Sequence, residues 1–108
     1  MKLDIAKDFN GRDFDINGVY QLLQSYGPLF WSWGAEGFVR IKNKALRFKS
    51  NGHHHKGLVY ISLNGSDLFD IHLTTLNDTI VEVIKDIYRE DLFDTIDKKI
   101  EFIEDYVR

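Results

Sequence analysis

Cysteine is absent from this chain of 108 residues, which also has only one proline and one methionine. Without cysteine the protein has no disulfide scaffold, no thiolate metal site and no cysteine nucleophile. Long apolar runs are missing as well, and the first residues, MKLDIAKDFNGRDF, carry three aspartates, so they form neither a signal peptide nor a membrane span. We therefore expect a cytoplasmic protein that makes no contact with a membrane.

Acidic residues are absent between Gly37 and Ser66. That stretch holds six lysines and arginines and three consecutive histidines, whereas the last part of the chain is mainly acidic. The net charge of -3 favours solubility and argues against general coating of nucleic acid. The sequence thus predicts a basic middle and an acidic end.

Hydrophobic residues make up 44% of the chain and charged residues 29%, as in soluble globular proteins. Residues 1–108 are enough for one domain with one core. Apart from the three histidines, the chain has no low-complexity segment, and it has no internal repeat or linker. We therefore predict a single domain.

The stretch from Leu58 to Leu73, LVYISLNGSDLFDIHL, contains the clearest structural signal. Apolar and polar residues alternate on both sides of Asn64-Gly65-Ser66-Asp67, a pattern typical of a β-hairpin. A loop of even length would place Asp70 opposite Ile61 on the buried face. We therefore predict a loop of odd length in which Gly65 adopts a left-handed conformation and forms a bulge.

A second hairpin is predicted over residues 38–49, FVRIKNKALRFK. A two-residue turn at Asn43-Lys44 pairs Ile41 with Leu46, so that the apolar faces coincide. The same register places Arg40 opposite Arg47. The other face of this hairpin would then carry four cations, Arg40, Lys42, Arg47 and Lys49.

A helix is predicted to begin at Asp15 or Asn17, either of which can cap it. Its expected buried stripe consists of Ile16, Val19, Tyr20, Leu23 and Tyr26. Gly27-Pro28 should end this helix. The aromatic segment from Leu29 to Trp33 then favours a short strand, with Leu29, Trp31 and Trp33 on one face.

The last part of the chain allows two interpretations. Thr79 to Ile84 is rich in β-branched residues, which favours a strand, and a terminal helix would follow from about Glu90 to Tyr106. Apolar residues also keep close to helical spacing here, so one long helix from Asp78 is the alternative for residues 79–88. We prefer the strand, and the terminal helix should then bury Leu92, Phe93, Ile96, Ile100 and Ile103.

Together these elements predict an α+β fold: an N-terminal helix, an antiparallel meander sheet of five or six strands, and a C-terminal helix packed on one sheet face. The two helices should cover one face of the sheet and leave the other partly open. An uncovered edge strand leaves two states open, a monomer or a homodimer that pairs through that edge.

The basic hairpin face of Arg40, Lys42, Arg47 and Lys49 is the first candidate site, as a contact surface for nucleic acid or another anion. Cations paired across strands repel each other unless an anion or carboxylate lies between them. The alternative is a solvated sheet face, or one that the acidic terminal helix neutralises.

His53, His54 and His55 form the second candidate, because alternate histidines of an extended segment can point the same way. A metal site needs ligands that converge from a rigid frame, and these histidines have no ordered carboxylate partner. We interpret them as a polar loop and predict neither a metal site nor a cofactor.

Four polar residues should meet on the outward face of the central hairpin: Tyr60, Ser62, Asp70 and His72. Asp70 and His72 are neighbours along one strand and point in parallel, so they do not form the relay of a Ser-His-Asp triad. The sequence also lacks a glycine-rich nucleophile elbow. We interpret Tyr60, Asp70 and His72 as a polar cluster that can face a partner, and we expect no enzymatic activity.

Five segments between about Gln21 and Leu92 form a pattern: QLLQSYG, FWSWGAEGF, LRFK, LVYISLNGSDLFDIHL and IYREDL. The most specific piece is Leu-Asn-Gly-x-Asp-x-Phe/Tyr-Asp, which starts at Leu63. With this pattern the chain resembles a family of small uncharacterised proteins encoded by bacteriophages and related mobile elements. It differs from that family at Tyr26, where a second glycine is common, and in the bulky Trp33. The resemblance implies a small α+β fold and a mobile-element setting, and it assigns no activity or catalytic residue.

We therefore expect a non-enzymatic binding module whose partner is an unknown macromolecule, a protein in preference to a nucleic acid. Binding of nucleic acid through the basic hairpin face is the alternative, and a small hydrolase is the third. Trp31 and Trp33 could stack on such a partner, although two tryptophans on one strand face are more typical of a core.

Overall fold

The computed structural model describes residues 1–9, 11–52 and 54–100. Its five strands form one antiparallel sheet in the order β1-β2-β3-β4-β5, so each strand pairs with its neighbours in the sequence. The strands are β1 (Glu36–Ile41), β2 (Ala45–Asn51), β3 (Lys56–Leu63), β4 (Phe69–Thr74) and β5 (Ile80–Ile87). The helices are α1 (Ile5–Asp8), α2 (Ile16–Gln24), α3 (Pro28–Trp31) and α4 (Leu92–Ile100), with a short 3-10 helix, η1 (Arg89–Asp91), before α4. The predicted α+β meander is confirmed.

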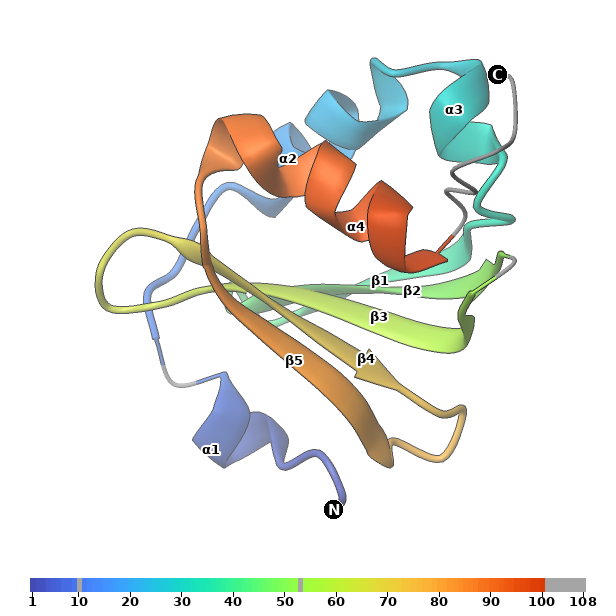
Figure 1. The fold of residues 1–108 in the computed structure, drawn as a ribbon. Coiled ribbons are helices and arrows are strands. Elements are labelled where there is room, and N and C mark those ends of the chain that lie inside the picture. Colours follow the sequence, from blue (N-terminus) through green and yellow to red (C-terminus); the bar gives the residue numbers. More distant parts are fainter. Residues whose placement is uncertain (10, 53, 101–108) are drawn as a thin grey trace.

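The helices lie on both faces of the sheet (Figure 1). Helices α2, α3 and α4 cover one face and bury the main core there, and α1 lies on the other face, which we call the α1 side. The α1 side has a smaller buried cluster of Phe9, Ala45 and Tyr60. Three helices therefore cover the face on which two were predicted, because α3 lies there in addition to α2 and α4. The other face was expected to be partly open, and α1 covers part of it.

In the central hairpin Val59 lies opposite Leu73 and Ile61 lies opposite Ile71, so the apolar faces of the two strands coincide. Its loop runs over residues 64–68, so the predicted odd length is confirmed. The left-handed residue is Asp67, with a φ of 62°, and the prediction that Gly65 adopts this conformation is wrong. Aspartate tolerates the left-handed region better than most residues.

Helix α2 begins where the sequence predicted. Asp15 is its N-cap, and the carboxylate accepts a hydrogen bond from the Gly18 N–H at 3.1 Å. Gly27, with a φ of 60°, turns the chain after the helix. The strand predicted from Leu29 to Trp33 is wrong, because Pro28 stands at the first position of a new helix, α3, where its fixed φ is favourable.

The strand interpretation of the last part is confirmed, and β5 extends to Ile87, three residues beyond the predicted end. Helix α4 buries Leu92, Phe93, Ile96 and Ile100 as predicted. The predicted burial of Ile103 and the helix end at Tyr106 lie outside the described residues. No helix in the described ranges is long and apolar enough to cross a membrane.

The N-terminal residues attach to the start of β5, a contact that the sequence did not predict. The Leu3 N–H donates to the Asp78 carbonyl at 2.8 Å, and the Ile80 N–H donates to the Met1 carbonyl at 2.7 Å. These bonds place α1 and Phe9 against the α1 side of the sheet.

Candidate functional site

The turn of the first hairpin contains three residues, Lys42-Asn43-Lys44, where the sequence predicted two. Lys42 adopts the left-handed conformation with a φ of 51°. The Lys44 N–H closes the turn by donating to the Ile41 carbonyl at 3.0 Å. Ile41 therefore pairs with Ala45, and the register is shifted by one residue from the predicted one.

This shift separates the cations of the predicted basic face, because a slip of one residue moves a side chain to the other face of the sheet. Arg40 pairs with Leu46 and lies on the helix-covered face, whereas Arg47 pairs with Tyr60 and lies on the α1 side. The prediction that Arg40 lies opposite Arg47 is wrong. The four cations predicted to share one surface, Arg40, Lys42, Arg47 and Lys49, do not do so.

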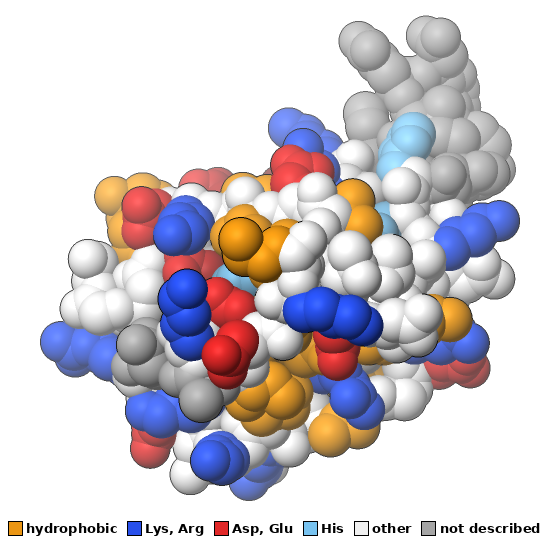
Figure 2. All heavy atoms as spheres, turned by 90° about the horizontal axis from the view of Figure 1, so that it is seen from below, with side chains coloured by type: hydrophobic (Ala, Val, Ile, Leu, Met, Phe, Trp, Pro, Cys, Tyr) orange, Lys and Arg blue, Asp and Glu red, His pale blue; other side chains and the backbone are white. Residues whose placement is uncertain are grey.

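The charges on the α1 side are mixed in sign. Lys49 pairs with Glu36 at 3.7 Å between Nζ and Oε1. Arg47 interacts with Tyr60, and its Nε is buried without a hydrogen-bond partner. Figure 2 shows Lys and Arg side chains interspersed with Asp and Glu side chains over this face. The visible surface has no continuous basic track of the kind that follows a phosphate backbone.

The predicted cluster of Tyr60, Asp70 and His72 forms, but residues before β1 cover part of it. Tyr60 pairs with His72, and Ser62 pairs with Asp70. Phe9 stacks on the Tyr60 ring at 5.3 Å between centroids and packs edge-on against His72 at 5.2 Å. Tyr60 and His72 therefore lie on the predicted face, away from the main core, but they are buried, and the prediction that they are open to a partner is wrong.

Burial controls the ionisation of this cluster. The Tyr60 hydroxyl donates to Asp78 Oδ1 at 2.5 Å, and burial together with this carboxylate raises the pKa of Tyr60 to about 12. Burial lowers the pKa of His72, and the nearby carboxylates of Asp8 and Asp70 only partly oppose it. His72 Nδ1 has no hydrogen-bond partner. With its raised pKa, Tyr60 keeps its hydroxyl proton at neutral pH and donates it in the hydrogen bond to Asp78.

Asp70 serves the loop between β3 and β4. Asn64 Nδ2 donates to Asp70 Oδ1 at 2.9 Å and to Asp86 Oδ1 at 2.8 Å. Asn64 Oδ1 accepts hydrogen bonds from the backbone N–H groups of Ser66 at 2.8 Å and Leu68 at 3.3 Å. One amide side chain therefore uses both of its ends to hold the loop and two carboxylates together.

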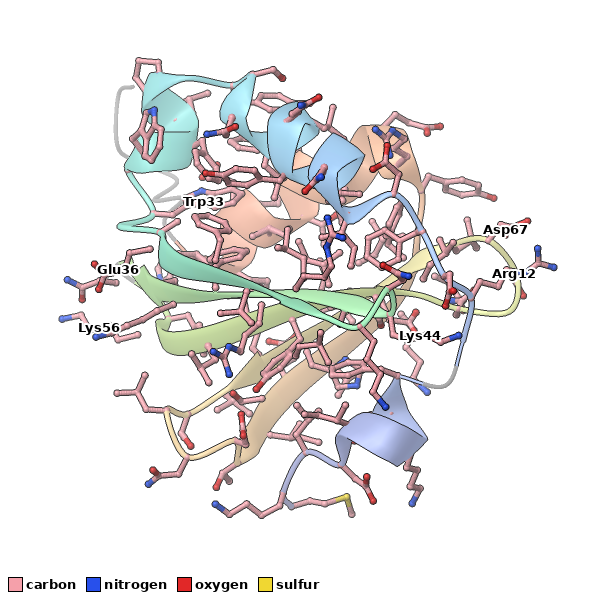
Figure 3. All side chains as sticks on the ribbon, turned by 180° about the vertical axis from the view of Figure 1, so that it is seen from behind. Arg12, Trp33, Glu36, Lys44, Lys56 and Asp67 are labelled. Atoms are coloured by element: carbon pink, nitrogen blue, oxygen red, sulfur yellow. The ribbon has the colours of Figure 1, made fainter. Side chains whose placement is uncertain are left out.

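Trp31 and Trp33 lie in different environments. Trp33 is buried between α3 and the sheet (Figure 3), stacks on Phe93 at 4.7 Å between centroids, and donates from Nε1 to Asp97 Oδ1 at 2.9 Å. Trp31 is 56% exposed. The interpretation of both tryptophans as core residues is therefore right for Trp33 and wrong for Trp31.

Trp31 belongs to an exposed apolar surface that the sequence did not predict. Tyr26 is 37% exposed and Leu29 is 38% exposed, and Pro28 between them is also exposed. We call these four residues, Tyr26, Pro28, Leu29 and Trp31, the α3 surface. The available sequence signal was the proline after Gly27, which can begin a helix as well as end one.

A groove with a volume of about 250 Å³ lies between α2 and β1, and we call it the α2–β1 groove. Its lining residues are Ile16, Asn17, Tyr20, Phe38, Val39, Arg40 and Leu46. The rings of Tyr20 and Phe38 contact each other at 4.6 Å between centroids. Arg40 is exposed and forms no ion pair with a residue in the described part of the chain. The groove thus combines an apolar lining with one available guanidinium group.

The two described histidines of the segment, His54 and His55, do not belong to a group of side chains that could hold a metal ion. His53 lies outside the described residues. His54 is exposed, and His55 is buried with its Nε2 at 3.1 Å from the Leu58 carbonyl. Within residues 1–9, 11–52 and 54–100, no three His, Asp or Glu side chains are grouped to hold a metal ion.

The α3 surface and the α2–β1 groove are joined by a series of aromatic contacts. Phe38, which lines the groove, lies 5.9 Å from Phe30 between ring centroids, and Phe30 lies 5.0 Å from Trp31. These two surfaces are therefore the candidate contact sites. Comparisons with family models, with curated proteins and with solved structures found no match for this chain.

Proposed function

We propose that this protein is a non-enzymatic module that binds another protein through its α3 surface. The observation that carries the proposal is the exposure of Trp31, in a short segment in which Tyr26 and Leu29 are also exposed. Tryptophan and tyrosine are enriched at protein interfaces and among the residues that contribute most to binding. An exposed tryptophan with apolar neighbours is therefore a natural anchor for a protein partner.

The α3 surface is well supported by the core beneath it. Phe30, inside α3, is fully buried and packs edge-on against the Trp31 ring. Tyr26 stacks on Phe93 of α4, with 3.7 Å between ring centroids. Such support reduces the side-chain entropy that is lost on association, so the surface is prepared for binding.

A protein partner agrees better with the charge distribution than a nucleic acid does. The four cations predicted to form one basic face are separated, and Lys49 is already paired with Glu36. The resemblance to proteins of bacteriophages and mobile elements supports a partner in the cytoplasm of the cell that carries the element. We include this setting in the proposal.

The test compares wild-type protein with Trp31→Ser as bait in a host lysate. A captured protein is then purified, and its affinity for each variant is measured by calorimetry. We expect Trp31→Ser to weaken binding by at least about tenfold, because removing a central aromatic anchor costs about 1.4 kcal/mol or more of binding free energy.

Leu76→Ser is the matched control, because Leu76 is 59% exposed and lies in the turn between β4 and β5, which Figure 1 shows far from α3. This variant should bind the partner like the wild type. A purified partner whose affinity is the same for wild type and Trp31→Ser would contradict the proposal, as would turnover of a substrate by the protein.

A further inference from the structure

We propose that the α2–β1 groove is a subsite for an acidic anchor of the partner, an aspartate or glutamate next to a large apolar residue. The apolar side chain fills the groove and the carboxylate binds the Arg40 guanidinium. This inference rests on the proposed function, because it names the chemistry of the segment that the protein partner presents.

The size of the groove fits one large side chain. Its volume of about 250 Å³ is below the range of roughly 300–1,000 Å³ that is usual for pockets that hold drug-sized ligands. Ile16, Phe38 and Leu46 give it an apolar lining, so burying an apolar side chain there is favourable.

Arg40 is the charged group of the groove. Two other cations of the first hairpin have acidic partners: Lys44 binds Asp13 at 2.8 Å and Lys49 binds Glu36 at 3.7 Å. Arg40 has no such partner among the described residues. A guanidinium group presents a planar pair of donors that matches a carboxylate, which makes a carboxylate the complementary ligand.

The two aspartates that precede α2 already have other contacts. Asp13 is paired with Lys44, and Asp15 accepts the hydrogen bond from Gly18 that caps α2. Asn17 and Tyr20, which also line the groove, form no side-chain hydrogen bond with another described residue. An amide and a hydroxyl are thus available to bind the backbone of an incoming segment.

The position of β1 explains why recognition uses side chains. β1 is an edge strand, and its pairing with β2 is irregular between Glu36 and Val39, where Gly37 has a φ of 65°. Irregularities of this kind prevent an edge from pairing with a further strand. A partner segment beside β1 is therefore held by the groove and Arg40 rather than by a new ladder of backbone bonds.

The test uses two dipeptide probes, N-acetyl-Phe-Glu-amide and N-acetyl-Phe-Gln-amide, in NMR titrations of isotope-labelled protein. The first probe should shift the backbone amides of Asn17, Tyr20 and Arg40 and should bind at least about tenfold more tightly than the second. Arg40→Gln should remove this preference. Lys42→Gln, which removes an exposed cation two residues away and outside the groove lining, should keep it.

Equal affinity for the two probes, shifts confined to another surface, or an unchanged preference in Arg40→Gln would each overturn the inference. Because Arg40 is exposed, Arg40→Gln should fold, and its melting temperature checks this. With a purified partner, weakening by Trp31→Ser but not by Arg40→Gln would leave the proposed function intact and contradict the groove assignment. A glutamate preference without any partner that depends on Trp31 would contradict the proposed function alone.

Discussion

Trp33 donates a hydrogen bond from its indole Nε1 to Asp97 Oδ1 at 2.9 Å, and both side chains are buried. The bond joins the segment after α3 to α4 across the helix-covered side of the core. Buried carboxylates need donors, because removal from water is costly when no hydrogen bond replaces it. This pair therefore fixes the position of α3, and with it the α3 surface.

Trp33→Phe should lower the free energy of unfolding by about 2–4 kcal/mol, because it removes a donor to a buried carboxylate and leaves a space in the core. Urea denaturation measures this loss. Trp31→Phe is the matched control, since the same change at an exposed ring should stay within about 0.5 kcal/mol. Equal losses in the two variants would contradict the buried assignment of Trp33.

His72 should make the protein less stable in weak acid. Burial lowers the pKa of His72 below its ordinary value of about 6.5, so the unfolded chain binds more protons than the folded one below that pH. The neutral His72 ring therefore makes its full contribution to the free energy of unfolding above about pH 6.5. This contribution decreases as the pH falls toward the pKa of His72 in the folded protein. Asp8, Asp70 and Lys85 are the charged groups that face this ring.

The measurement for His72 is urea denaturation at several values between about pH 7.5 and 5. His72→Phe keeps an aromatic ring beneath Phe9 and should lose less stability over this range than the wild type does. Parallel pH profiles for wild type and His72→Phe would show that His72 does not titrate in this way.

Tyr60 should remain protonated after an ordinary tyrosine has ionised. With its pKa raised to about 12, the neutral hydroxyl contributes stability below about pH 10, and this contribution is lost as the pH rises toward 12. A titration followed by phenolate absorbance should show one late step in the wild type that Tyr60→Phe lacks. Asp78→Asn should move the late step to lower pH, because the Asp78 carboxylate adds to the effect of burial.

Asn64→Asp should destabilise the loop between β3 and β4 by about 2–3 kcal/mol. The change keeps an oxygen for the N–H groups of Ser66 and Leu68 but replaces the donor to Asp70 and Asp86 by a third carboxylate.

Asn77→Asp is the control for this loop, because Asn77 lies exposed in the turn between β4 and β5 and makes its hydrogen bonds through the backbone. It should change the free energy of unfolding by less than about 0.5 kcal/mol. If Asn64→Asp is equally mild at neutral pH, the two carboxylates do not depend on the amide.

The central hairpin could be predicted because its determinants are local. Alternation of apolar residues and the parity of the loop fix which side chains face each other, and both are visible between Leu58 and Leu73. The left-handed residue was assigned wrongly, since glycine was expected there. The Asn64 side chain holds the loop, and Asp67 takes the left-handed conformation within it. The backbone N–H of Asp67 donates to the backbone carbonyl of Asn64 at 3.1 Å.

The register of the first hairpin depends on contacts that no local pattern shows. Lys44 Nζ donates to the Gly11 carbonyl at 2.8 Å and pairs with Asp13, and the Phe14 N–H donates to the Asn43 carbonyl at 3.2 Å. The segment before α2 therefore anchors this turn from about 30 residues away. Arg40 was singled out from the sequence as an anion-contact candidate, and the structure places it in a groove that depends on this shift and on the position of α2.

The α3 surface was hidden for a different reason. Alternation from Leu29 to Trp33 is compatible with a strand, but the first residues form a helix that turns Phe30 inward, and Trp33, which follows this helix, is also buried. Short apolar segments do not distinguish the two. Only the packing of Phe30 and Trp33 against the sheet and α4 shows that Trp31 faces outward.

The attachment of the N-terminal residues to β5 has a consequence for local unfolding. Every hairpin of the meander closes a short loop, whereas the bonds of Leu3 and Ile80 join segments more than 70 residues apart and involve few groups. We expect residues 1–9 to detach while the sheet stays intact, so the Leu3 and Ile80 amides should exchange with solvent deuterium well before that of Ile61. Each opening would expose the side chains of Tyr60 and His72 to water. This part of the α1 side would then be accessible only during the short time in which residues 1–9 are detached.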